Sequence, residues 1–179
     1  MNLGDFDETF IPEDKDLTLA DRWILTSFNE TVAKVTEDLD KFELGDAADA
    51  VYNFIWNSYC DWYIELAKKR LYQAESERDK HTVQYVLVYV LTHTLEMLHL
   101  HALRYGTPLA APASRSESII VAPWPKTQDK WNFPADAATM NTMMEAIKGI
   151  RNLRAESNVP MGKKAPVILA PATEDMLRP

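Results

Sequence analysis

Residues 46–72, DAADAVYNFIWNSYCDWYIELAKKRLY, decide the fold. Apolar side chains recur along this stretch at the i, i+4, i+7 spacing of one helix face, and no glycine or proline interrupts them. The spacing predicts one long amphipathic helix over 46–72. Such a helix must bury its apolar face against other elements, so the rest of the chain is expected to supply them.

Three further segments have helical periodicity. Thr18 followed by Asp21 is typical of a capping box and predicts a helix over 19–39. Apolar spacing predicts another helix over 79–100. Asp136 is expected to cap a fourth helix that ends near Ser157, before Pro160. The apolar stripe of the fourth helix would comprise Met140, Met143, Met144, Ile147, Ile150 and Leu153.

Long helices joined by short polar turns predict an all-α fold, an antiparallel helical bundle with a short C-terminal strand-containing tail. Prolines make 104–131 mainly loop, and the apolar run 166–170 resembles one strand. The expected domains are an acidic, flexible linker (1–16), the bundle (17–135, with an irregular loop over about 101–135), and the fourth helix with the start of a truncated C-terminal element (136–179).

The composition indicates a cytoplasmic protein. The 179 residues carry a net charge of -8, so the chain as a whole does not attract a polyanion such as RNA. The acidic residues are concentrated over 5–16, however, so a basic face elsewhere in the chain remains compatible with RNA binding. Cys60 is the single cysteine, which suits a reducing compartment. The acidic start lacks the features of a signal peptide, and no apolar run is long enough to span a membrane. We therefore expect no membrane partner.

Motifs that could carry catalysis are incomplete. Glu96 and His99 form a Glu-x-x-His, but a carboxylate-bridged metal bundle needs a second such motif and two further glutamates, so no metal site is predicted. The glycines are scattered and form no phosphate-binding loop. Cys60 has no orienting third group and is expected to be a buried structural thiol. We assign no catalytic residue and no cofactor to this chain.

Two features could contact nucleic acid. Between residues 147 and 164 the only acidic residue is Glu156, whereas the cations of this stretch are Lys148, Arg151, Arg154, Lys163 and Lys164. The first three are spaced by three residues and share a helix face that could bind phosphates or simply be solvated. Trp56 lies off the apolar stripe of its helix, so its ring is a candidate for stacking on an unpaired base. The basic residues at 68–70 more simply complement the helix dipole.

Four strings resemble, in order and spacing, the anticodon-binding region of valyl-tRNA synthetases. They are LTLADRWIL (17–25), YNFIWNSYCDWYIELAK (52–68), SIIVAPWP (118–125) and IRNLRAESNVP (150–160), within a resemblance that covers about 17–169.

The resemblance implies a fragment of a class Ia aminoacyl-tRNA synthetase. The parent enzyme would attach valine to its tRNA using ATP, on a catalytic domain that this chain lacks. The implied partners are valine-specific tRNA and the missing catalytic domain, and the fragment is expected to be inactive alone. The alternative function is a helical protein–protein interaction module without RNA binding, which salt dependence would distinguish.

The resemblance breaks down between residues 100 and 115. One permitted codon choice for ALRYGTPLAAPAS (102–114) lets a shifted reading frame encode Pro-Tyr-Val-Thr-Glu-Arg-Arg-Trp-Gln-His-Leu-Pro, which resembles the segment expected in this family. We hypothesise that a compensated pair of frameshifts replaced the stretch. Resequencing the coding DNA tests this hypothesis, because codons incompatible with the second frame would contradict it.

Overall fold

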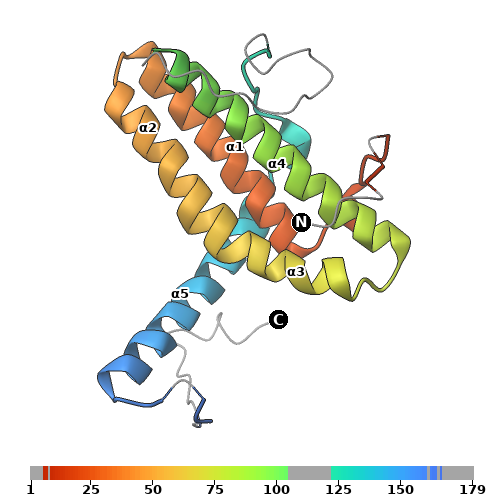
Figure 1. The fold of residues 1–179 in the computed structure, drawn as a ribbon, viewed down its shortest axis with the longest axis vertical. Helices are drawn as coiled ribbons and strands as arrows, with labels where there is room; N and C mark the ends of the chain where they lie inside the picture. The colour runs from red at the N-terminus through yellow and green to blue at the C-terminus, as the bar shows by residue number, and fades with distance from the viewer. Residues whose placement is uncertain (1–5, 8, 105–121, 161, 165, 167–179) are drawn as a thin grey trace. The chain divides into compact units, whose positions relative to one another are not determined.

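The computed structural model describes residues 6–7, 9–104, 122–160, 162–164 and 166. Its helices, in chain order, are α1 (Leu19–Asp40), α2 (Leu44–Asn53), the π-helical η2 (Phe54–Ile64), α3 (Glu65–Tyr72), α4 (Glu77–Arg104) and α5 (Pro134–Glu156) (Figure 1). The short 3-10 turns η1 (Asp14–Asp16) and η4 (Asp129–Trp131) complete the described elements. The all-α prediction is confirmed, and the predicted strand over 166–170 lies almost wholly outside the described residues.

The chain divides into two compact units, residues 1–140 and 141–179. In the first unit, α1 contacts α2, η2, α4 and η4 and therefore lies at the centre of the bundle. The turn between α1 and α2 is short, as antiparallel neighbours require, and α2, η2 and α3 form one continuous helical path (Figure 1). In the described ranges, no helix is both long and apolar enough to cross a membrane.

A buried polar network holds the start of α1 to three other elements. The predicted capping box is confirmed, because the Thr18 N–H donates to Oδ2 of Asp21 at 2.9 Å and the Asp21 N–H donates to Oγ1 of Thr18 at 3.4 Å. Asp21 is fully buried, and it also accepts hydrogen bonds from the Tyr63 hydroxyl and from Nη1 of Arg70, both at 2.6 Å. Arg70 reaches further to Asp79 at 2.5 Å. The Asp21 carboxylate thus connects α1, η2 and α3, and Arg70 extends the network to α4.

Replacing Tyr63 with phenylalanine should lower the free energy of unfolding by about 1–3 kcal/mol at neutral pH, because the buried Asp21 carboxylate loses a donor. Burial, and next the Asp21 charge, raise the pKa of Tyr63. The unfolded chain therefore releases this proton above about pH 10 while the folded chain keeps it, so stability falls as pH rises further. Denaturant unfolding at pH 8 and pH 11 should show a smaller alkaline loss for Tyr63→Phe, whereas an unchanged loss would contradict this assignment.

The middle of the long helix differs from its prediction. An unbroken α-helix over 46–72 would place Ile55 and Trp62 on its apolar face, but residues 54–64 form a π-helix in which Tyr59 is buried and both of these side chains are half-exposed. A π-helix has a longer repeat than an α-helix, so the buried positions shift along the chain. The inward-facing residues become Phe54, Tyr59, Tyr63 and Ala67.

The start of α5 corrects the prediction for Asp136. The helix begins at Pro134, so Asp136 lies inside its first turn and is not its cap. The Asp136 carboxylate accepts from Nη1 of Arg22 on α1 at 3.1 Å. The Phe133 N–H donates to Oγ1 of Thr26 at 2.9 Å, and the guanidinium of Arg22 lies 5.3 Å from the centre of the Phe133 ring. Side chains of α1 therefore fix the beginning of α5.

The predicted apolar stripe of α5 is only partly buried. Met140 and Met144 are buried, as expected. Met143, Ile147 and Leu153 are exposed, with 49%, 37% and 63% of their surface accessible. Periodicity identifies an apolar face of a helix, but it does not say how much of that face another element covers.

Part of the acidic N-terminal segment is attached to α4. Arg78 makes ion pairs with Asp16 at 2.6 Å and with Glu13 at 3.1 Å. The hydrogen bond from Arg78 lowers the pKa of Asp16 to about 2. The guanidinium of Arg78 also lies 5.7 Å from the centre of the Phe10 ring. Residues 10–16 consequently have specific partners near the beginning of the bundle.

Candidate nucleic-acid interface

The basic cluster of the second unit comprises the predicted cations Lys148, Arg151, Arg154, Lys163 and Lys164. Lys148 forms an ion pair with Glu145 at 2.9 Å, a carboxylate just outside the stretch that defined the cluster. Arg151, Lys163 and Lys164 are exposed. Exposed cations on a helix and its following turn have the chemistry needed to approach phosphate groups without burying charge.

The end of α5 folds the chain back along the helix. Asn158 has φ 51, and this left-handed residue stops the helix. The Val159 N–H donates to the Arg154 carbonyl at 3.0 Å, and the Asn158 N–H donates to the Ala155 carbonyl at 3.1 Å, the paired bonds of a Schellman motif. This turn explains how Lys163 lies next to the last turn of α5.

Arg154 stabilises the chain reversal, a role that the sequence did not predict. Its Nη2 donates to the carbonyl oxygens of Pro160 and Lys163, both at 2.9 Å. These bonds bring Arg154 and Lys163 together, so the cluster is a local arrangement and not only a run in the sequence. Arg154 is also less exposed than Arg151, Lys163 and Lys164, so these three side chains are the stronger candidates for phosphate contact.

An aromatic pair on the first unit is the second feature. Trp56 is 51% exposed, which confirms the prediction that it lies off the buried stripe. Tyr52, one helical turn earlier, is 61% exposed, and the two ring centres are 6.1 Å apart. Sequence analysis did not single out Tyr52, although its spacing of four residues from Trp56 was the available signal. Exposed rings of this kind can stack on unpaired bases.

The other groups that the sequence singled out are Glu96, His99 and Cys60. Glu96 pairs with Nδ1 of His93 at 2.6 Å, whereas the ring nitrogens of the buried His99 have no hydrogen-bond partner among the described residues. The described ranges contain no group of three or more His, Cys, Asp and Glu side chains that could hold a metal ion. Cys60 is half-exposed and not buried as predicted, and burial followed by the Asp61 charge raises the pKa of its thiol. A raised pKa disfavours the nucleophilic thiolate.

Arg70 is the centre of the buried network, so the basic residues at 68–70 form no joint surface patch. Lys68 makes an ion pair with Glu65 at 2.5 Å. Lys68 and Arg70 therefore have roles within the bundle, in agreement with the interpretation that the basic residues at 68–70 are structural.

The chain belongs to the anticodon-binding domain family of tRNA ligases, whose family model matches residues 21–169. More particularly, it is similar to bacterial valine–tRNA ligases. Identity is 43% to the enzyme of Carboxydothermus hydrogenoformans over 99% of this chain and 20% of that protein. It is 39% to the Bacillus cereus enzyme and 41% to the Enterococcus faecalis enzyme, over 99% and 98% of this chain and 20% of each relative.

The chain spans about one fifth of the length of these relatives. Because the alignments cover 98–99% of this chain, they confirm the family resemblance that was inferred from four short strings.

Proposed function

We propose that this chain is the anticodon-recognition module of a valine–tRNA ligase and that it binds the anticodon stem and loop of valine tRNA. The similarity to valine–tRNA ligases over 98–99% of the chain carries this proposal. The match to the anticodon-binding family supports it as well. The helical protein–protein interaction module, considered from the sequence, is the less favoured function.

The two surface features suit different parts of RNA recognition. Arg151, Lys163 and Lys164 are exposed cations that would contact the RNA backbone, which contributes affinity without sequence information. Tyr52 and Trp56 expose aromatic faces that would stack on unpaired loop bases. Because the chain as a whole carries a charge of -8, binding has to rely on these local features and should be modest in strength.

Aminoacylation belongs, in this proposal, to parts of the ligase outside this chain. Those parts would bind ATP and valine and would form the ester with tRNA, in the cytoplasm. This chain would orient the tRNA by holding its anticodon arm, and it would require no cofactor of its own.

A salt titration of tRNA binding tests this function. Binding to valine tRNA should weaken steeply as salt rises, because each phosphate contact releases a counterion. A non-cognate tRNA should show a similar salt slope but lower affinity, since backbone contacts are shared and base contacts are not. Affinity that is the same for both tRNAs and nearly independent of salt would contradict the proposal and favour the protein-interaction function.

A further inference from the structure

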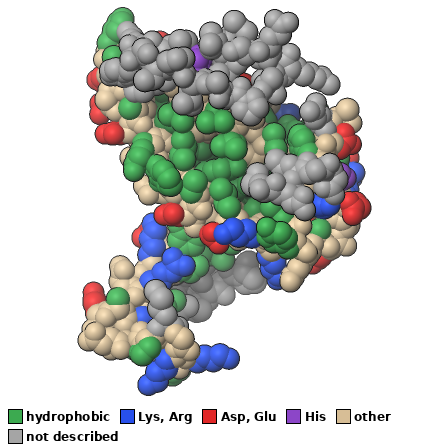
Figure 2. All heavy atoms as spheres, viewed as in Figure 1, with side chains coloured by type: hydrophobic (Ala, Val, Ile, Leu, Met, Phe, Trp, Pro, Cys, Tyr) green, Lys and Arg blue, Asp and Glu red, His purple; other side chains and the backbone are tan. Residues whose placement is uncertain are grey.

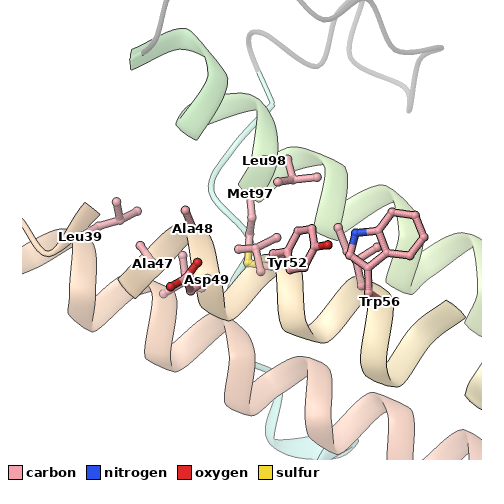
Figure 3. A pocket seen from close by; sticks show the side chains of 11 residues that line it. Leu39, Ala47, Ala48, Asp49, Tyr52, Trp56, Met97 and Leu98 are labelled. Atoms are coloured by element: carbon pink, nitrogen blue, oxygen red, sulfur yellow. The ribbon is translucent and has the colours of Figure 1, made fainter. Parts of the chain in front are cut away.

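An apolar groove opens between α2, η2 and α4, with α1 behind it. Its volume is about 460 Å³, and hydrophobic side chains gather on this face of the bundle (Figure 2). Figure 3 shows Tyr52 and Trp56 along one wall of the groove and Met97 and Leu98 of α4 on the facing wall. The two exposed aromatic rings of the first unit therefore belong to a hollow and not to a flat surface.

The walls of the groove suit a flat aromatic ligand. The rings of Tyr52 and Trp56 are inclined at 54° with their centres 6.1 Å apart, so they are not stacked on each other. Met97 and Leu98 supply aliphatic surface opposite these rings. A nucleobase that entered the groove would stack on an aromatic face on one side and pack against aliphatic side chains on the other.

One carboxylate can read the edge of such a base. Among the described lining residues, Asp49 is the one charged side chain, and it is exposed. It precedes Tyr52 by three residues, so the two side chains share one helix face. An ionised carboxylate only accepts hydrogen bonds, so it favours a base edge that presents an amino group over one that presents a carbonyl oxygen.

The charges around the groove decide which part of an RNA can enter it. Asp40, Glu43 and Asp46 are exposed in the stretch before Asp49. Their negative charges repel phosphate, so the RNA backbone stays outside the groove and an uncharged base is the part that enters.

We infer that the groove is the subsite for the unpaired cytosine of the valine anticodon. The cytosine ring stacks on Tyr52 or Trp56, and its N4 amino group donates to the Asp49 carboxylate, where uracil would place a carbonyl oxygen. Valine codons begin with G-U, so every tRNA that reads them carries cytosine as its third anticodon base. The inference rests on the proposed binding of the anticodon loop and adds to it the base that one side chain selects.

Replacing the Asp49 carboxylate with an amide tests this inference. Two RNA hairpins with the sequence of the valine tRNA anticodon arm are compared, one with the natural cytosine and one with uracil in its place. The unmodified chain should bind the cytosine hairpin about tenfold more tightly. Asp49→Asn should reduce this ratio to about twofold or less, because the amide N–H can donate to the uracil carbonyl. An unchanged ratio would overturn the inference.

Asp46→Asn is the matched control. It removes the same charge from an exposed residue of α2 that does not line the groove. Loss of a negative charge should strengthen the binding of both hairpins alike in either variant, and the ratio of the two affinities cancels this effect. An equal decrease of the ratio in both variants would show a general effect of charge and would contradict a hydrogen bond to Asp49.

A photocrosslink locates the cytosine independently of affinity. The hairpin is prepared with iodocytosine at this position and irradiated in the presence of the unmodified chain, and mass spectrometry identifies the modified residue. Attachment to Tyr52 or Trp56 would support the subsite, whereas attachment confined to other residues would refute it.

The proposed function and the groove subsite fail in different ways. Salt-dependent binding of both hairpins with an affinity ratio that Asp49→Asn leaves unchanged would preserve anticodon-arm binding and overturn the subsite alone. Absence of binding to the hairpins and to whole valine tRNA would contradict both.

Discussion

Replacing Arg70 with methionine should lower the free energy of unfolding by about 3–5 kcal/mol, a large part of the stability of a domain. The Arg70 side chain is 18% exposed and the Asp21 side chain is fully buried, so removing the cation leaves a buried carboxylate without its charge partner. Asp79 loses its partner as well. The loss should therefore be much greater than the loss of packing alone.

Equilibrium unfolding in denaturant, monitored by circular dichroism, measures this effect. Arg78→Met is the matched control, because Arg78 also pairs with two carboxylates but is 48% exposed. Exposed ion pairs contribute little, so the control should lose less than about 1 kcal/mol. Similar losses for the two variants would contradict the role assigned to the buried network.

Removing Arg151, Lys163 and Lys164 together should weaken the binding of valine tRNA by about 10- to 100-fold at low salt. Each cation that contacts a phosphate contributes close to one unit to the slope of log affinity against log salt, so the triple alanine variant should reduce that slope by about 2–3. Arg154 stays in place because it holds the turn that positions Lys163.

The matched control changes Lys15, Lys41 and Lys69 to alanine, which removes the same charge from exposed positions of the first unit. Long-range electrostatics would be altered equally in both triple variants, whereas direct contacts would be lost only in the first. Filter binding at several salt concentrations distinguishes these effects. An equal decrease in affinity and slope for the two variants would rule out direct phosphate contact by the basic cluster.

Local signals in the sequence predicted the bundle well. The Thr18–Asp21 capping box fixed the start of α1, and turn composition placed the ends of α1 and α3 within about one residue. The π-helix over 54–64 could not be predicted, because its sequence has the same apolar density as an α-helix and only packing selects the wider turn. The cap at Asp136 was wrong because proline at the first helical position, Pro134, was the stronger start signal.

The candidate site was predicted in composition but not in arrangement. Charge density identified the basic cluster, and helical position identified Trp56 as exposed. The bonds of Arg154 to two backbone carbonyls depend on the left-handed turn at Asn158, a tertiary detail that spacing does not encode. Tyr52 was overlooked because a tyrosine in an aromatic-rich helix is more often part of the core.

The most direct test of anticodon recognition compares valine tRNA with a variant of the same tRNA in which only the three anticodon bases are exchanged. Binding of this chain to both is measured by fluorescence anisotropy at one fixed salt concentration, so backbone contacts are identical. We expect the exchange to weaken binding by about 10-fold or more, in line with the roughly 1–3 kcal/mol that stacking on a base contributes. Equal affinities would contradict recognition of the anticodon by this chain.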